Sequence, residues 1–127
     1  MYQQFEIVWV SYPFSDQPEK SKKRPALIVS NDASNALDND VLVCPITSTL
    51  RGDAFAVQLT GAMLTSSLPL DSEVRCNKVT TVRTSLILGT ITAVLPEYRQ
   101  ELFNLIVKAL LPDSIKWSIK LPIEPGD

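Results

Sequence analysis

The chain has 127 residues, of which 45% are hydrophobic and 20% are charged, and its formal net charge is −2. This length fits a single domain, residues 1–127, and the apolar content is enough for a core without disulfides or a structural metal. The slightly acidic balance excludes a chain that is basic throughout, so binding of nucleic acid would need a local cluster of cations. Lys20, Lys22, Lys23 and Arg24 form such a cluster.

Residue types that are absent or rare argue against several kinds of site. The chain has no histidine, which excludes Ser-His-Asp and Cys-His arrangements. Its two cysteines, Cys44 and Cys76, do not suffice for a zinc site and are expected to be buried free thiols. No segment has the basic and apolar pattern of a signal peptide or the roughly 20 apolar residues of a membrane span. We therefore expect a cytoplasmic protein with no membrane partner, no metal and no other cofactor.

Most of the chain has the apolar patterns of short β-strands, which are predicted at residues 5–10, 25–30, 40–46, 54–59, 72–82 and 86–93. Between the first two, Ser11–Lys23 is polar and predicts a long loop, either functional or a simple connector. The second strand is apolar almost throughout, which indicates burial on both faces. Pro45 predicts an end or bulge in the third strand, and Gly89 predicts a bulge in the last.

One amphipathic helix follows the strands. It begins at Pro96, ends before Pro112, and has its apolar residues at helical spacing: Leu102, Leu105, Ile106, Ala109 and Leu110. Residues 111–127 form a tail whose alternating pattern suits either an extra edge strand or a strip used in dimerisation. Many strands followed by one helix predict a mainly β, α+β fold, a small SH3-like barrel closed by a C-terminal α-helix.

The chemistry of the chain is concentrated at two strand ends. Arg24 lies next to a rigid strand, where a guanidinium can grip a phosphate, although a surface ion pair is the alternative. Thr47 and Ser48 follow the third strand and place hydroxyls there, either for a ligand or to cap the backbone. Tyr12 and Phe14 are candidates for stacking on RNA bases, whereas Trp9 has the pattern of a core residue.

Several segments share their order and residue types with one protein family: Ile7–Val10, Pro13–Asp16, Lys23–Asn31, Cys44–Ser48, Ser72–Arg75 with Lys78, and Leu88-Gly89 before the helix. From about Phe5 to Leu110 the chain resembles the MazF/PemK toxin endoribonucleases, and its Ser-x-Val-Arg-x-x-Lys pattern is closer to a PemK-like branch. The resemblance implies a Kid/MazF/CcdB-type fold and a homodimer with an RNA groove at or near its interface. It also implies metal-independent cleavage of single-stranded RNA at short sequences, neutralisation by a cognate antitoxin, and DNA binding together with that antitoxin.

By this resemblance Arg24 and Thr47 are the catalytic residues. The expected RNA-binding residues are Lys22, Lys23, Ser48, Arg75, Lys78, Tyr12 and Phe14, with a solvated strand face as the plainer interpretation of Arg75 and Lys78. Such a site would use the 2′-hydroxyl of the RNA as nucleophile, and the carboxylates that could serve as its base are Asp16, Glu19 and Glu73.

The chain departs from the family pattern at Thr80–Arg83, where some members have an Arg-Thr pair followed by an acidic residue. Two alternatives therefore stay open. One is a toxin of the same fold that binds RNA or antitoxin without cleaving. The other is a gyrase poison similar to CcdB, in which Trp117 after the helix would contact the topoisomerase.

Overall fold

The computed structural model describes residues 1–13 and 21–112. The strands are β1 (Glu6–Pro13), β2 (Ser21–Ile28), β3 (Asp40–Thr47), β4 (Ala56–Leu59), β5 (Ser72–Arg75), β6 (Thr80–Arg83) and β7 (Ile87–Ala93). The helices are α1 (Asp32–Asn35) and α2 (Arg99–Leu110), with single 3₁₀ turns at Gly61–Met63, Thr84–Leu86 and Pro96–Tyr98. Phe14, Asp16, Glu19, Lys20 and the alternating part of the tail, with Trp117, lie outside the described residues.

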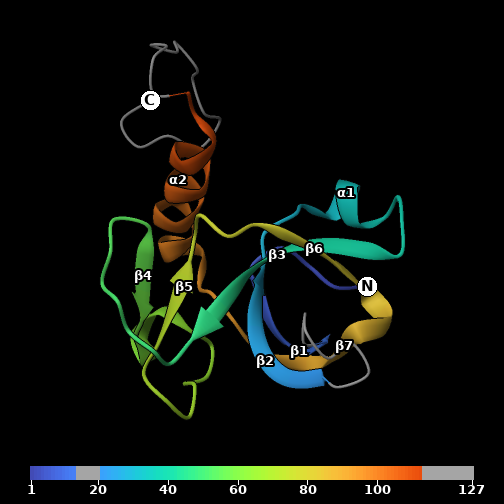
Figure 1. Cartoon of the computed structure of the whole chain (residues 1–127), viewed down its shortest axis with the longest axis horizontal. Helices are drawn as coiled ribbons and strands as arrows, with labels where there is room; N and C mark the ends of the chain where they lie inside the picture. The colour runs from blue at the N-terminus through green and yellow to red at the C-terminus, as the bar shows by residue number, and fades with distance from the viewer. Residues whose placement is uncertain (14–20, 113–127) are drawn as a thin grey trace.

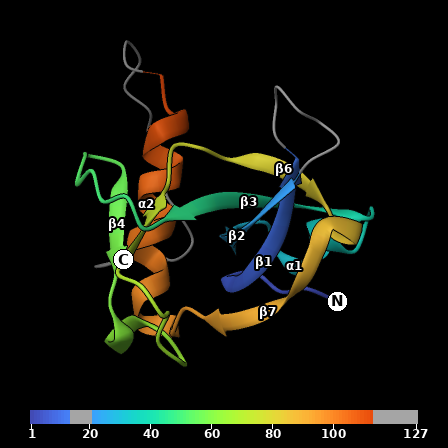
Figure 2. The same ribbon diagram turned by 60° about the horizontal axis from the view of Figure 1, so that its bottom comes forward.

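All strand pairs are antiparallel, and the main order is β4-β5-β3-β2-β1-β7, with β6 paired to β3. Figures 1 and 2 show α2 beside β4 and β5, while β1, β2 and β7 form the other half of the molecule. The predicted mainly β class with a C-terminal helix is confirmed. The sheet is open, because β6 and β7 do not pair with each other in the described part of the chain.

The core has two parts, which lie on opposite faces of β1, β2 and β3. On one face Ile7, Leu27 and Cys44 pack with the buried residues of α2, Leu102 and Ile106. A second cluster of buried residues packs on the other face: Val8, Val10, Ala26, Ile28, Val41, Val43, Val82 and Ile87. Alternate residues of β2 thus enter different cores, which confirms its predicted burial on both faces.

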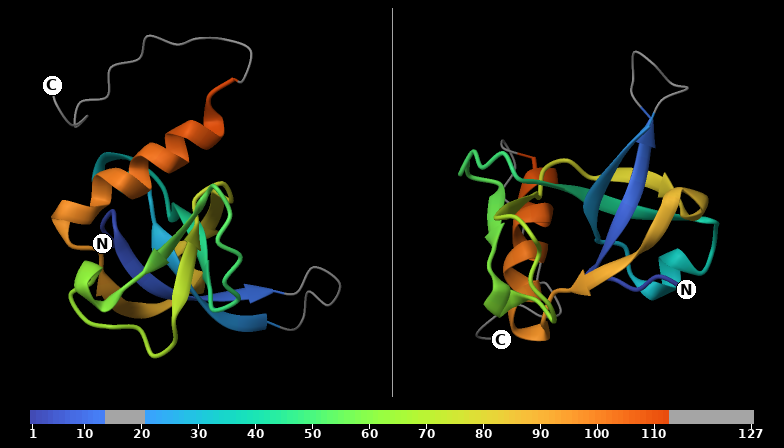
Figure 3. Two further views of the ribbon diagram at one scale, coloured as in Figure 1. Left: turned by 90° about the vertical axis from the view of Figure 1, so that its left-hand side faces the viewer. Right: turned by 90° about the horizontal axis from the view of Figure 1, so that it is seen from below.

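The predicted end of the first strand and the predicted start of the second are both wrong, because the two strands pair over a greater length than expected. Ser11–Pro13 and Ser21–Lys23 pair with each other, so β1 and β2 extend into the stretch predicted as loop. The described ends of this hairpin project away from the side that carries α2 (Figure 3). Arg24 therefore lies within a strand, opposite Val10, and not at the end of a loop.

The single strand predicted at 72–82 is two strands. β5 pairs with β4 and with the end of β3, whereas β6 pairs with the beginning of β3. The chain must cross from one end of β3 to the other between them, so residues 76–79 leave the sheet. The bulge predicted at Gly89 is confirmed, since the β1–β7 register passes from Trp9 opposite Gly89 to Val10 opposite Ile87. Gly89 has φ +156° there.

No helix in residues 1–13 or 21–112 is long and apolar enough to cross a membrane.

Candidate functional site

A fork between β2 and β3 creates the groove that contains the predicted catalytic residues. Pairing of β2 with β3 ends at Ala26 opposite Pro45, and beyond this point Ile46 and Thr47 pair with β5 instead. Pro25 and Pro45 stand at the fork, and neither has an N–H to continue a ladder between the two strands. The space that opens between the separated strands is the groove.

The groove has a volume of about 270 Å³. One wall comes from β1 and β2, one from the end of β3 with the residue after it, and a third from the segment before β5 with the first residue of β5: Trp9, Lys22, Lys23, Arg24, Pro25, Ile46, Thr47, Ser48, Leu68, Pro69, Leu70 and Ser72. The structure thus brings together five of the residues predicted for the site, which are Lys22, Lys23, Arg24, Thr47 and Ser48.

The charge of the groove is positive. Lys22, Lys23 and Arg24 are all exposed, and none of the described residues that line the groove is acidic. Three cations without a counter-charge in the lining attract a phosphate-bearing ligand.

Thr47 is half-buried at the end of β3, and its hydroxyl is oriented by the backbone. Its Oγ1 accepts the N–H of Thr49 at 3.1 Å. This is the backbone cap that the sequence left as an alternative, and it also has a chemical consequence. Because a hydroxyl that accepts one hydrogen bond still has its own proton, Thr47 can donate that proton to an oxygen in the groove.

Trp9 was expected to belong to the core, but it is only half-buried and lines the groove. The Nζ of Lys23 lies 4.6 Å from the centroid of its ring. Such a cation–π contact holds the ring and the ammonium together in the groove wall. The register explains the exposure, because Trp9 pairs with Pro25, at the point where β3 has separated from β2.

Tyr12 does not line the groove. It packs against the core cluster that contains Val8 and Val10, and its hydroxyl is enclosed without a hydrogen-bond partner among the described residues. Burial raises the pKa of this phenol, with a smaller contribution from Cys44. Tyr12 therefore anchors the end of β1 and is not placed to stack on an RNA base in the groove.

Arg75 and Lys78 do not line the groove. Arg75 donates from Nη2 to the carbonyl oxygen of Thr49 at 3.4 Å, so its guanidinium supports the loop after β3. Lys78 is exposed in the turn between β5 and β6. An RNA that reaches these two residues would have to extend beyond the groove.

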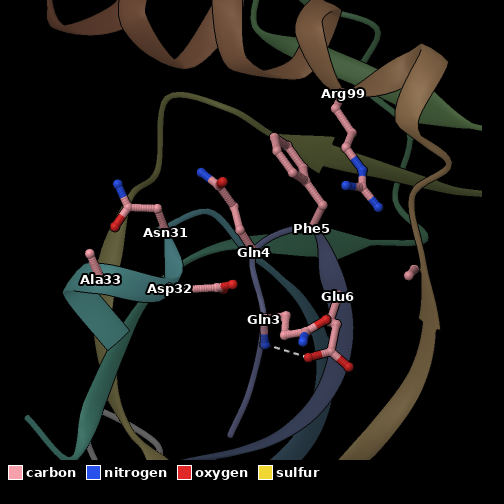
Figure 4. Close-up of a pocket in the computed structure, with 9 residues that line it drawn as sticks. Gln3, Gln4, Phe5, Glu6, Asn31, Asp32, Ala33 and Arg99 are labelled. Carbon is pink, nitrogen blue, oxygen red and sulfur yellow. Dashed lines mark hydrogen bonds between the residues drawn. The ribbon is translucent and has the colours of Figure 1, made fainter. Parts of the chain in front are cut away.

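Another hollow, with a volume of about 510 Å³, lies beside α1 and the beginning of α2 (Figure 4). Arg99 lies within it, donates from Nε to the carbonyl oxygen of Val94 at 2.9 Å, and lies over the ring of Phe5 at 5.5 Å from its centroid. Glu6 and Asp32 also line this hollow. Two carboxylates against one guanidinium make it a poorer place for a phosphate than the groove at the fork.

The chain matches one protein family over most of its length. Residues 3–110 match the model of the PemK-like, MazF-like toxins of type II toxin–antitoxin systems. The comparison with curated proteins found no match.

Several solved structures share the fold. One is an endoribonuclease in complex with its cognate antitoxin from a mycobacterial species, with 20% identity, coverage of 92% of this chain and 99% of that chain, and a TM-score of 0.72. Another is the Mycobacterium tuberculosis toxin MazF-mt6, with 24% identity, coverage of 87% and 99%, and a TM-score of 0.64. A third is the MazE–MazF complex of Deinococcus radiodurans, with 20% identity, coverage of 86% and 95%, and a TM-score of 0.71. With the family match over residues 3–110, the chain belongs to the PemK-like, MazF-like toxins of type II toxin–antitoxin systems.

Proposed function

We propose that this protein is a metal-independent endoribonuclease toxin that cleaves single-stranded RNA at short sequences. The observation that carries the proposal is the fork at Pro25 and Pro45, where Arg24 and Thr47 line one positively charged groove. The family match and the endoribonucleases among the similar structures support the same activity.

The reaction requires a base for the proton of the 2′-hydroxyl, positive charge with hydrogen-bond donors for the phosphate, and a proton for the leaving oxygen. The 2′-oxygen of one nucleotide loses its proton and attacks the adjacent phosphorus, the P–O5′ bond breaks, and the leaving 5′-oxygen takes up a proton. Arg24 supplies positive charge and two parallel N–H donors to the phosphate oxygens, and Thr47 donates a hydrogen bond from its hydroxyl to a phosphate oxygen. The proton that the leaving 5′-oxygen takes up comes from water. The products are an RNA ending in a 2′,3′-cyclic phosphate and an RNA beginning with a 5′-hydroxyl.

The base is the remaining requirement. Arg24 stays protonated in ordinary environments, which makes it a poor proton acceptor. Of the carboxylates considered from the sequence, Glu73 is buried and does not line the groove. This leaves Asp16 and Glu19, in the segment outside the described residues, as the carboxylates to test by substitution.

The groove also has an apolar side that suits a nucleobase. Trp9, Leu68 and Leu70 lie along it, and Leu70 is 65% exposed. Bases of single-stranded RNA bind proteins by stacking on aromatic rings while cations hold the backbone. We propose that Trp9 replaces Tyr12 as the stacking residue, with Lys22 and Lys23 on the phosphates and Ser48 beside Thr47.

The partners follow from the family. We propose a cytoplasmic homodimer that a cognate antitoxin neutralises and that binds DNA only together with that antitoxin. Light scattering of the purified protein tests the dimer, and a monomer at micromolar concentration would contradict it.

The test of the activity is incubation of purified protein with a mixed RNA in EDTA, followed by sequencing of the new ends. We expect cuts at one short recurring sequence, with cyclic phosphate and 5′-hydroxyl termini. RNA that is bound and left intact would favour the non-cleaving alternative, and DNA breaks in the presence of gyrase would favour the CcdB-like one.

A further inference from the structure

Glu73 on β5 is a buried carboxylate whose role the proposed reaction leaves open. Its side chain is 2% exposed, and in the sheet it lies opposite Thr47 of β3 and Gln58 of β4. A carboxylate removed from water needs hydrogen-bond donors, because an unpaired buried charge is strongly unfavourable. The donors that Glu73 uses come from the loop after β3.

Two successive backbone N–H groups of that loop point at one oxygen of Glu73. Oε1 accepts from the N–H of Arg51 at 2.7 Å and from the N–H of Gly52 at 3.3 Å. Adjacent N–H groups turned toward one anion form a nest, a backbone shape that requires a left-handed residue. Gly52 supplies it with φ +61°. The loop is therefore folded around the carboxylate of Glu73.

The same loop begins with the hydroxyls of the groove. The backbone N–H of Thr49 donates to Oγ1 of Thr47, and the carbonyl oxygen of Thr49 accepts from Nη2 of Arg75. Arg75 is two residues from Glu73 on β5, so their side chains lie on the same face of the strand. Ser48, which lines the groove, lies between these contacts. β5 thus holds the loop at Thr49 through Arg75 and at Arg51 and Gly52 through Glu73.

We propose that Glu73 is a positioning residue, which holds the Thr47–Gly52 loop so that the hydroxyls of Thr47 and Ser48 face the bound RNA. This inference rests on the proposed function. It also removes Glu73 from the candidate bases, because Oε1 is occupied by the loop and Oε2 is enclosed, with no hydrogen-bond partner among the described residues. Glu73 acts through the loop and does not touch the reacting atoms.

Glu73→Ala and Glu73→Gln separate positioning from a general structural role. Alanine removes the acceptor, so we expect kcat to fall about ten- to a hundredfold, as for a misplaced catalytic group, with KM within about twofold of wild type. Glutamine keeps an oxygen acceptor for both N–H groups and should retain kcat within about threefold. Gln58→Ala, at the exposed neighbour on β4, is the matched control and should change neither constant.

Hydrogen exchange of the Arg51 and Gly52 amides gives a readout that does not depend on cleavage. Both amides should be protected in the wild type and in Glu73→Gln, and should exchange faster in Glu73→Ala. If Glu73→Ala does not fold, Gly52→Ala disturbs the same loop from its other side. Among the described residues, apart from Gly52 and its two neighbours in the chain, no atom lies within 4 Å of where the new Cβ would be, so its effect comes from the positive φ. We expect Gly52→Ala to lower kcat and spare KM.

The inference is overturned if folded Glu73→Ala cleaves as the wild type does, or if Gly52→Ala leaves kcat unchanged. Equal loss of kcat in the glutamine and alanine variants, with both amides still protected, would also overturn it. These results leave the proposed function intact. A wild-type protein that cuts no RNA would instead refute the proposed function, and the positioning role would fall with it.

Discussion

Replacing Thr47 by valine removes one hydroxyl from the groove and keeps the volume of the side chain. Thr47 is half-buried, and its hydroxyl accepts a hydrogen bond from Thr49 while its own proton is available to the phosphate. A preorganised donor to the charge that develops in a transition state contributes about 3 kcal/mol. Since about 1.4 kcal/mol corresponds to a tenfold change in rate, Thr47→Val should lower kcat about a hundredfold.

The same change should have a small effect on folding. The lost contact with Thr49 is a single exposed hydrogen bond, so the free energy of unfolding should fall by at most about 1 kcal/mol. The assay is single-turnover cleavage of a fluorescent single-stranded oligonucleotide in EDTA, with urea unfolding measured on the same preparations. Thr47→Ser keeps the hydroxyl and should stay within about fivefold of wild type. Cleavage by Thr47→Val within threefold of wild type, where about a hundredfold is expected, would refute the donor role.

Further changes test the core, the thiols and the charge of the groove. Leu102→Ala should lower the free energy of unfolding by about 3 kcal/mol because Leu102 is fully buried, whereas Leu110→Ala, at a side chain that is 72% exposed, should leave it nearly unchanged; equal effects in urea titrations would contradict the packing of α2. Burial raises the pKa of Cys44 and of Cys76 to about 12, so both should resist iodoacetamide at pH 8 in the native state. Because the unfolded thiols ionise near pH 9, their contribution to stability is present below that pH and declines as the pH rises toward 12; rapid native alkylation, or stability that rises over this window, would contradict their burial. Lys23→Gln should reduce the slope of log affinity for single-stranded RNA against log salt by about 0.7, and an unchanged slope would remove Lys23 from the phosphate contacts.

The presence of most strands and of the C-terminal helix could be predicted because local pattern decides them. The apolar run of β2, the proline before α2 and the glycine of the β7 bulge each act within a few residues. The pairing of Arg24 with Thr47 comes from the resemblance of Arg24-Pro25 and Pro45-Ile46-Thr47 to motifs of the family, and both residues line the groove.

The parts that could not be predicted depend on which distant segments pair. Trp9 lies in a continuous apolar run and so has the pattern of a core residue, yet it lines the groove because β3 separates from β2 at Pro45. Tyr12 belongs to a polar stretch with prolines that is typical of a loop. Its pairing with Lys22 instead extends the strand, and its ring packs against the core. The contact of Glu73 joins positions 21 and 22 residues apart in the chain, and no spacing in the sequence indicates it.

Arg24 is the central residue of the proposed site, and one experiment tests its role directly. Wild type, Arg24→Ala and Arg24→Lys are compared for cleavage of a single-stranded RNA in EDTA, at equal concentrations of protein shown by circular dichroism to be folded. Arg24 is exposed, so its loss should not disturb the fold. We expect Arg24→Ala to lose cleavage by at least about a hundredfold, and Arg24→Lys to recover only part of it because an ammonium lacks the two parallel donors of a guanidinium. Cleavage by folded Arg24→Ala at the wild-type rate and at the same sequences would contradict the proposed site.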